Sequence, residues 1–328
     1  MEKTFNLSNG AQIPCVGLGC GAIKEDEIED TLRTALKSGY RLFDCALLYG
    51  NEAWIGTAFE KIFSEGEYSR EDVFITTKLP MIGNHPDRVE YFLKKSLENL
   101  KTSFVDLYLI HFPVGFQYEN EDNYFPKKDG IIQLDFSHTD LVSLWKAMEQ
   151  QVIAGRTKAI GISNFNVKQI SQILKCRIPP ANLQIEVHAY FQQKELRDFC
   201  KNNGIVVEAY APLGSPGRRE AFKPNGVPQV LADPIVTAIA QRYSKSPAQI
   251  LLRFLVDEKV VVLPKSVSPV RLHENIELFD FEMTAEDHAQ LNSLDRGEKG
   301  RSFDYLKIFQ GLEKHPENPM PIMEFVEE

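Results

Sequence analysis

Residues 73–111, with the sequence VFITTKLPMIGNHPDRVEYFLKKSLENLKTSFVDLYLIH, contain two apolar runs on either side of an amphipathic segment. The runs at 73–77 and 104–110 are rich in aliphatic, β-branched and aromatic side chains, which is typical of buried strands. Between them, residues 87–100 carry apolar side chains at helical spacing. The stretch therefore predicts a strand–helix–strand unit, and such units build parallel sheets.

The same alternation recurs along the chain. Further strand-like runs occupy residues 16–19, 40–43, 157–162, 182–186, 205–210 and 260–263, and helical patterns occupy 26–38, 140–152, 166–175, 192–202, 234–243, 247–256 and 270–278. Eight strands that alternate with helices predict a closed (β/α)8 TIM barrel. No Pro- or Ser-rich linker divides the chain, so we expect a single domain over residues 1–328.

Other segments lie outside this regular pattern. Asn9-Gly10, between two short apolar segments, predicts an N-terminal β-hairpin ahead of the barrel. Residues 113–138 and 211–233 are long connections after the fourth and seventh strands, and the tail 296–328 has no clear periodicity. Long connections in a compact domain are usually functional, so we expect these three segments to shape an active site at one rim.

Composition narrows the class of protein. The 328 residues are 43% hydrophobic and 25% charged, which is ordinary for a globular protein, and the net charge of −9 does not favour nucleic-acid binding. No run of apolar residues is long enough for a membrane span, and the N-terminus has no apolar signal core, so a cytoplasmic protein is expected. Five cysteines without a Cys-x-x-Cys pair favour neither a disulfide framework nor a metal site.

Four polar residues follow the predicted strands at the point where each strand ends. Asp44 and Tyr49 come after the second strand, Lys78 after the third and His111 after the fourth. In parallel α/β barrels these ends meet on one rim, where the chemistry takes place. Each residue type alone more often has a structural role, but the four together indicate a proton-transfer site.

The chemistry follows from the side chains. A lysine ammonium beside a phenol favours the phenolate and lowers the pKa of the tyrosine from about 10, so Lys78 is expected to lower that of Tyr49. Asp44 would keep Lys78 charged, and His111 would hydrogen-bond and orient a carbonyl oxygen. Because no metal or cysteine cluster supplies electrons, a bound hydride carrier is expected.

Two alternatives compete with this interpretation. Gly17-Leu18-Gly19-Cys20-Gly21-Ala22 fits the dinucleotide-binding fingerprint of Rossmann folds, with Asp44 as the ribose-binding acid. However, the next helix begins several residues too late, and Tyr49, Lys78 and His111 stay unexplained. A Schiff-base aldolase that uses Lys78 is the second alternative, and the residues alone leave it open.

Five motifs resemble the signatures of the aldo-keto reductase superfamily. They are Phe43-Asp44 with Tyr49-Gly50-Asn51-Glu52, Thr77-Lys78-Leu79, Asp106–Pro113, Gly161–Phe165 and Leu263–Ser266. The resemblance covers residues 10 to about 295, in the expected order, and is strongest to the aldose and aldehyde reductase branch. It is looser to insect members that include 3-dehydroecdysone reductases.

The resemblance implies a role for each matching position. Tyr49 would be the general acid, tuned by Lys78 and Asp44, and His111 would orient the substrate carbonyl. The nicotinamide of the cofactor would contact Ser163, Asn164 and Gln184 and stack on Tyr210. Leu213 and Ser215 would lie along the pyrophosphate, with Lys24 reaching over it.

A cationic, hydroxyl-rich cluster follows the last strand and indicates the adenosine end of the cofactor. It comprises Lys265, Ser266, Val267, Ser268 and Arg271 at the start of a helix, followed one turn later by Glu274 and Asn275, which would face the adenine. Helix amides and the arginine fork suit a 2′-phosphate. NADPH/NADP+ is therefore expected in preference to NADH.

The chain departs from the aldose reductase pattern around the substrate. Tryptophans of that pattern are replaced at Gly21 or Ala22, Pro80, Phe112 and about residues 220–222. With Leu48, Phe112, Tyr124 and Phe125 as the expected walls, the pocket should be less aromatic and wider, and should suit aryl or alicyclic carbonyls better than sugar aldehydes.

The resulting hypothesis is a monomeric NADPH-dependent carbonyl reductase acting on a small-molecule substrate, with neither nucleic-acid nor membrane partners. The alternatives are a steroid or ecdysteroid ketone reductase and a nucleotide-binding structural or regulatory protein.

Overall fold

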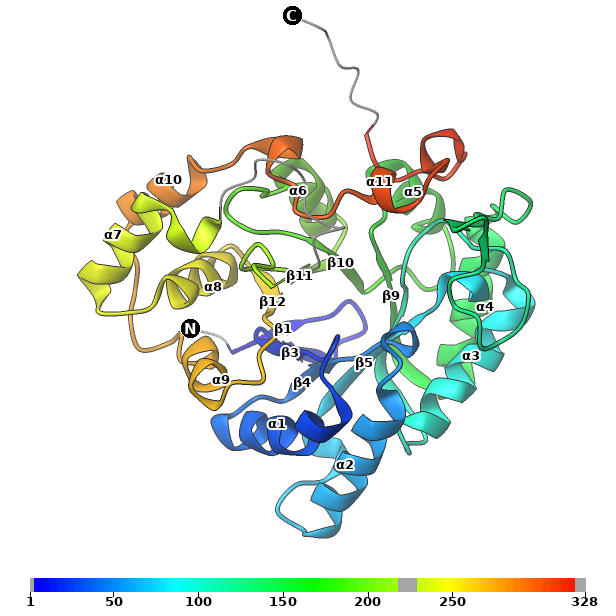
Figure 1. The fold of residues 1–328 in the computed structure, drawn as a ribbon, viewed down its shortest axis with the longest axis horizontal. Coiled ribbons are helices and arrows are strands. Elements are labelled where there is room, and N and C mark those ends of the chain that lie inside the picture. The colour runs from blue at the N-terminus through cyan, green and yellow to red at the C-terminus, as the bar shows by residue number, and fades with distance from the viewer. Residues whose placement is uncertain (1–2, 218–228, 322–328) are drawn as a thin grey trace, which may run out of the picture.

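The computed structural model describes residues 3–217 and 229–321. At its centre lies an eight-stranded parallel sheet in which neighbouring strands follow chain order, with helices outside it (Figure 1). The strands are β3 (Gly17–Gly19), β4 (Leu42–Asp44), β5 (Phe74–Leu79), β6 (Val105–Ile110), β9 (Thr157–Ser163), β10 (Asn182–Glu186), β11 (Val206–Tyr210) and β12 (Val260–Leu263).

The first and last strands of this sheet close on each other. The Val262 amide donates a hydrogen bond of 2.9 Å to the Cys15 carbonyl, and the Gly19 amide donates one of 3.2 Å to the Pro264 carbonyl. These bonds bring β12 beside β3, so the sheet is a barrel without open edges. The predicted (β/α)8 TIM barrel is confirmed, and the Rossmann alternative is wrong.

Helices form the outer layer of the barrel. They are α1 (Glu25–Ser38), α2 (Glu52–Ser64), α3 (Pro86–Asn99), α4 (Leu141–Ile153), α5 (Val167–Ile173), α6 (Lys194–Asn202), α7 (Pro234–Tyr243), α8 (Pro247–Asp257), α9 (Pro269–Ile276), α10 (Ala285–Asn292) and α11 (Tyr305–Ile308). Single 3-10 turns are η1 (Leu47–Tyr49), η2 (Arg70–Asp72), η3 (Met81–Gly83), η5 (Val230–Ala232), η6 (Gly297–Gly300) and η7 (Leu312–Lys314). None of the helices within the described ranges is long and apolar enough to span a bilayer.

The expected helices did not include α2, α10 or α11. In α2 the signal is present, because Ile55, Ala58, Phe59 and Ile62 are spaced i, i+3, i+4, i+7 and are all buried. α10 begins with a capping box, in which the Thr284 hydroxyl accepts from the Asp287 amide. α11 has only four residues and no fully buried one, so it leaves no periodic pattern.

The predicted N-terminal hairpin is confirmed as β1 (Thr4–Asn6) and β2 (Gln12–Pro14), which pair antiparallel. Gly10 in the connection has φ +84°, a conformation that suits glycine. Leu7 and Ile13 pack against Leu42 and Phe74 at the starts of β4 and β5, so the hairpin covers the N-terminal end of the barrel. The opposite end is left for the functional residues.

The long connection at 113–138 has local structure of its own. It contains a short antiparallel pair, β7 (Lys127–Lys128) and β8 (Ile131–Ile132). The connection starts after β6, and the one beginning at residue 211 starts after β11, so both leave the same end of the barrel. Part of the latter, residues 218–228, lies outside the described chain.

Candidate active site

The four polar residues expected at one rim come together there. Asp44 is the last residue of β4, Lys78 lies near the end of β5 and His111 directly follows β6. Tyr49 ends the turn η1, and the next residue, Gly50, has φ +71°. This left-handed residue, which glycine adopts without strain, turns the chain from η1 towards α2 and leaves Tyr49 facing the strand ends.

Lys78 is the centre of the cluster. Its ammonium is fully buried and donates three hydrogen bonds, to Asp44 Oδ1 at 2.6 Å, the Cys45 carbonyl at 2.9 Å and the Tyr49 hydroxyl at 3.3 Å. These acceptors use all three of its protons. Burial lowers the pKa of Lys78, but Asp44 and Tyr49 more than compensate and raise it above its usual value. Lys78 is therefore a buried cation.

The tyrosine does not have the pKa that the sequence suggested. Burial raises the pKa of Tyr49 to about 12, because the lowering effect of Lys78 is smaller than the cost of placing a phenolate in a buried site. The predicted net lowering is wrong for the protein alone. Tyr49 is consequently a neutral phenol at physiological pH, and Lys78 keeps it oriented.

His111 lies beside Tyr49. Its ring is 5.9 Å from that of Tyr49, with an angle of 82° between the ring planes. Burial, with a further contribution from Lys78, holds the pKa of His111 well below its usual value, so the imidazole is neutral. Nδ1 is enclosed and has no hydrogen-bond partner, whereas Nε2 is not among the enclosed unpartnered atoms of the described chain. Nε2 is therefore the atom available to a ligand.

Of the residues expected around a nicotinamide, Ser163 and Tyr210 end β9 and β11, Asn164 follows β9, and Gln184 lies in the middle of β10. The Asn164 amide group donates to the His111 carbonyl and to Ser163 Oγ, both at 3.0 Å, and accepts from the Tyr210 hydroxyl at 2.7 Å. Both of its N–H protons and one of the two acceptor positions of Oδ1 are thus used to hold its neighbours. The Gln184 Nε2 group donates to Asp44 Oδ1 at 2.9 Å and to Glu208 Oε2 at 3.3 Å.

Two polar groups at this end of the barrel can each form a further hydrogen bond. The Ser163 hydroxyl proton has no acceptor in the chain as described, since its only bond is the one it accepts from Asn164. Gln184 Oε1 likewise has no donor, and it is not one of the enclosed unpartnered atoms. One free donor and one free acceptor side by side match the carbonyl and amino group of a carboxamide.

The expected pyrophosphate residues flank the same end of the barrel. Leu213 and Ser215 are half-buried in the connection after β11, and Ser215 has φ +47°. Lys24 is exposed at the N-cap of α1. Their contact with the pyrophosphate stays a prediction.

The cluster expected at the adenosine end surrounds the start of α9. Ser266 is buried, and its hydroxyl accepts from the Ser268 amide at 3.1 Å. Lys265 and Arg271 are exposed and form no ion pair within residues 3–217 and 229–321. Val267 and Glu274 are half-buried and Asn275 is buried. Two exposed cations beside a helix start, with no ion pair in the part of the chain that the structure describes, favour an anionic ligand.

The side of the site near Phe112 is aromatic. Phe112 is buried, and its ring lies 5.1 Å from Tyr305 and 5.5 Å from Phe309, both in the C-terminal tail. The tail thus adds two aromatic rings beside Phe112, one of the expected walls, and a less aromatic pocket stays a prediction. Gly21 lies against the phenol, because a Cβ there would be in van der Waals contact with the Tyr49 ring at 3.6 Å.

The other expected wall residues lie at different depths. Leu48 is half-buried beside Tyr49. Tyr124 is half-buried with the Lys95 ammonium 5.7 Å from its ring, and Phe125 is 41% exposed and 6.3 Å from Phe116. Residues 220–222, one of the places without tryptophan, lie outside the described ranges.

The tail is attached to the barrel by a buried carboxylate that the sequence analysis missed. Glu186, at the end of β10, accepts hydrogen bonds from the amides of Ser302 and Phe303. Three residues later the Tyr305 hydroxyl meets that of Tyr210 at 3.1 Å. Nothing in the tail sequence signals these contacts, although an acid inside an apolar strand is itself a sign of a buried polar network.

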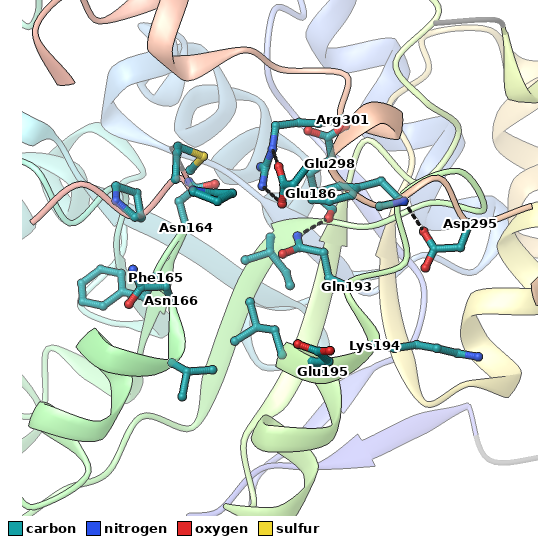
Figure 2. Close-up of a pocket in the computed structure, with 18 residues that line it drawn as sticks. Asn164, Phe165, Asn166, Glu186, Gln193, Lys194, Glu195, Asp295, Glu298 and Arg301 are labelled. Carbon is teal, nitrogen blue, oxygen red and sulfur yellow. Dashed lines mark hydrogen bonds and ion pairs between the residues drawn. The ribbon is translucent and has the colours of Figure 1, made fainter. Parts of the chain in front are cut away.

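A cavity of about 470 Å³ lies beside the tail, between the starts of α5 and α6 (Figure 2). Asn164, Glu186, Gln193, Glu298 and Arg301 are among its lining residues, and Gln193 donates to the Glu186 carbonyl. None of the residues of the Lys78 cluster lines it. The cavity therefore adjoins the nicotinamide-side residues from outside the barrel.

Comparison with known proteins gives a consistent picture. The family model described as "Aldo/keto reductase family" matches residues 12–296. The "Aldo-keto reductase family 1 member A1" proteins of Gallus gallus and Homo sapiens are 44% and 42% identical over 293 residues, which are 88% of this chain and of each relative. The solved "Structure of the Aldose Reductase from Schistosoma japonicum" is 40% identical with a TM-score of 0.87, and the match covers 97% of this chain and 98% of that one.

A family match over most of the chain, relatives above 40% identity and the same barrel lead to one conclusion. The chain belongs to the aldo/keto reductase family and is an oxidoreductase.

Proposed function

We propose that this protein reduces aldehydes and ketones to alcohols with NADPH, and that Tyr49 donates the proton. The observation that carries the proposal is the bonding of Lys78, whose three protons hold Asp44, the Cys45 carbonyl and Tyr49. A neutral phenol and a neutral imidazole that face the same space can both hydrogen-bond one carbonyl oxygen. A non-enzymatic binding role does not require this arrangement.

The cofactor proposal rests on groups with unused capacity. The Ser163 hydroxyl and Gln184 Oε1 complement the carboxamide of a nicotinamide. Lys265 and Arg271, which form no ion pair within residues 3–217 and 229–321, offer two cations for a 2′-phosphate, which would distinguish NADPH from NADH. Tyr210 would stack on the ring, and Leu213, Ser215 and Lys24 would line the pyrophosphate. When bound, the nicotinamide would supply a hydride.

The side chains would orient the substrate carbonyl, transfer the proton and stabilise the resulting phenolate. His111 Nε2–H would donate to the substrate carbonyl oxygen and fix its position. The Tyr49 hydroxyl would transfer its proton to the same oxygen as negative charge develops there. Lys78, held by Asp44, would stabilise the phenolate that results, because an ammonium 3.3 Å away favours the charged form. Removal of either ion would leave the other charge buried without compensation, at a cost of about 3–5 kcal/mol.

The pH dependence of turnover tests the protonation states. Because the pKa of His111 lies well below its usual value and that of Tyr49 is about 12, neither group changes charge near neutrality. We expect kcat/KM for aldehyde reduction at saturating NADPH to stay level between about pH 6 and 8. A loss of activity on acidification with a midpoint near the usual histidine pKa of about 6.5 would contradict a neutral His111.

Side chains of the tail and of neighbouring loops indicate which carbonyl compounds should bind best. Leu48, Phe112 and Tyr305 would form the inner wall, with Tyr124 and Phe125 further out, so an aryl or alicyclic carbonyl should bind better than a sugar aldehyde. A panel of glyceraldehyde, an aryl aldehyde, a bulky ketone and an ecdysteroid 3-ketone, followed by NADPH oxidation, tests this order. Higher kcat/KM for glyceraldehyde than for the bulky carbonyls would contradict it.

Tyr305→Ala is expected to change specificity rather than the reaction itself. Loss of a ring from the inner wall should raise the KM of an aryl aldehyde about tenfold and that of glyceraldehyde much less. Tyr118→Ala, which removes an exposed ring from the 113–138 connection, is the matched control and should change neither. Equal losses for both substrates in Tyr305→Ala would indicate a purely structural role.

A further inference from the structure

Glu208 is a buried acid inside the barrel to which the proposed mechanism assigns no role. It lies in the middle of β11, is fully buried, and is paired in register with Gln184 on β10. Its Oε2 accepts a hydrogen bond of 3.3 Å from Gln184 Nε2. The same nitrogen donates to Asp44 Oδ1 at 2.9 Å, so Gln184 bridges Glu208 and the Lys78 cluster.

The two acceptors fix the orientation of the Gln184 amide. A primary amide has two N–H protons, and both are taken, one by Asp44 and one by Glu208. A flipped amide would place its carbonyl oxygen against Asp44 Oδ1, which accepts from the Lys78 ammonium and offers no proton. Gln184 therefore presents only Oε1 to the open site, and this atom has no partner in the chain as described.

Glu208 acts as an acceptor without having to be charged. Burial raises the pKa of Glu208 to about 8, and the nearby Asp44 adds to the effect, so the carboxyl group holds a proton at neutral pH. Its second oxygen, Oε1, is enclosed and accepts no hydrogen bond of good geometry, and the Asn182 side chain lies close enough to interact with the carboxyl group. A proton on Oε1 leaves Oε2 as a carbonyl oxygen that accepts from Gln184.

The geometry points to Glu208 as a positioning residue for the cofactor: its Oε2 holds the Gln184 amide so that Gln184 Oε1 accepts from the amino group of the nicotinamide carboxamide. This rests on the proposed function, in which Gln184 contacts the nicotinamide. Two residues of β11 would then help to bind the nicotinamide, Glu208 through Gln184 and Tyr210 by direct contact with the nicotinamide ring. What matters at position 208 is an acceptor oxygen rather than a negative charge.

Two substitutions at Glu208 distinguish the effect of its acceptor oxygen from the effect of a negative charge. Glu208→Met keeps the length of the side chain and removes both oxygens, which frees one Gln184 proton and lets the amide reorient. The Kd for NADPH, measured by quenching of protein fluorescence, should rise about tenfold, which corresponds to one hydrogen bond of about 1.4 kcal/mol. Glu208→Gln offers an amide oxygen in the same place and should bind NADPH within about twofold of the unaltered protein.

A double-mutant cycle shows whether Glu208 acts through Gln184. In a Gln184→Ala background, Glu208→Met should change the Kd by less than about twofold, because the group it positions is gone. Glu149→Gln, on α4, is the control for loss of a buried carboxylate away from the site and should leave the Kd unchanged. Far-ultraviolet circular dichroism and thermal unfolding establish that each variant is folded.

The unaltered protein provides a test that does not depend on the folding of variants. The reduced 3-acetylpyridine analogue of NADPH carries a methyl group where the carboxamide has its amino group. If Gln184 Oε1 accepts from that group, the analogue should bind about tenfold more weakly than NADPH. Equal binding would overturn the assignment of Oε1, whatever the variants do.

The other possible results of these binding measurements decide whether Glu208 positions Gln184. Unchanged binding in Glu208→Met, equal losses in folded Glu208→Met and Glu208→Gln, or a full effect of Glu208→Met in the Gln184→Ala background would each overturn the role of Glu208. In those cases a loss of binding in Gln184→Ala alone would leave the proposed cofactor site standing. If Gln184→Ala binds NADPH normally, the nicotinamide assignment itself fails.

Discussion

Tyr49→Phe should reduce kcat for carbonyl reduction by about 1,000-fold or more while NADPH still binds with its original Kd. The substitution removes the phenolic proton and leaves the ring, so the wall of the pocket keeps its shape. Lys78 loses one acceptor but keeps Asp44 and the Cys45 carbonyl, so the buried cation stays compensated. Single-turnover measurements with bound NADPH would isolate the chemical step from product release.

Tyr108→Phe provides the matched control. Tyr108 is a fully buried tyrosine of β6 whose hydroxyl is enclosed without a partner in the described chain, so loss of that hydroxyl should not slow turnover. Residual activity of Tyr49→Phe above about one-tenth of the original would show that another group donates the proton. A parallel loss of NADPH binding would instead indicate that the site has rearranged.

Lys265→Ala combined with Arg271→Ala should weaken NADPH binding by about 100-fold and NADH binding by less than about threefold. Each cation is expected to make a charge-assisted hydrogen bond to the 2′-phosphate, and the two exposed side chains have no competing ion pair within the described residues. Because the contacts are exposed, added salt should weaken NADPH binding in the unaltered protein and much less in the double variant.

Lys175→Ala with Arg177→Ala is the control for net charge. These two exposed cations lie between α5 and β10, before the strand enters the barrel, and therefore at the end opposite the site. Their removal changes the net charge equally and should leave both Kd values unaltered. An equal loss of NADPH and NADH affinity in Lys265→Ala/Arg271→Ala would refute the 2′-phosphate assignment.

Much of the barrel could be predicted because its signals are local. Buried parallel strands are continuous apolar runs, and the amphipathic helices between them repeat their apolar side chains every three or four residues. Asp44, Lys78 and His111 could be brought together from sequence because each lies at or near a strand end, and parallel strands end on the same rim. Tyr49 follows by proximity along the chain.

The net pKa of Tyr49 could not be predicted in the same way. The effect of Lys78 has the expected sign, but burial of the phenol outweighs it. The size of that effect depends on how much protein surrounds the hydroxyl, and this is set by elements distant in sequence. A sequence can therefore indicate which charged residue acts on the pKa of Tyr49, but it does not indicate how strongly burial raises that pKa.

The tail illustrates the same limit in packing. Tyr305 reaches Tyr210, and Ser302 reaches Glu186, across more than ninety residues of chain. No periodic pattern marks a four-residue helix or a segment held by backbone hydrogen bonds to one buried carboxylate. The aromatic rings that pack on Phe112 come from residues remote in sequence, so the sequence pattern did not indicate them.

The sequence by itself determined the barrel, the order of its elements and the four residues that gather at its rim, because periodicity and strand ends are properties of neighbouring residues. Only the tertiary structure decided which polar atoms still have capacity for a ligand. Ser163, Gln184 and Asn164 look equivalent in sequence. In the structure, Asn164 donates both of its amide protons to neighbouring groups, whereas the Ser163 hydroxyl proton and Gln184 Oε1 have no partner within the described residues. Hydrogen-bonding capacity is finite, and its distribution depends on which side chains meet in space.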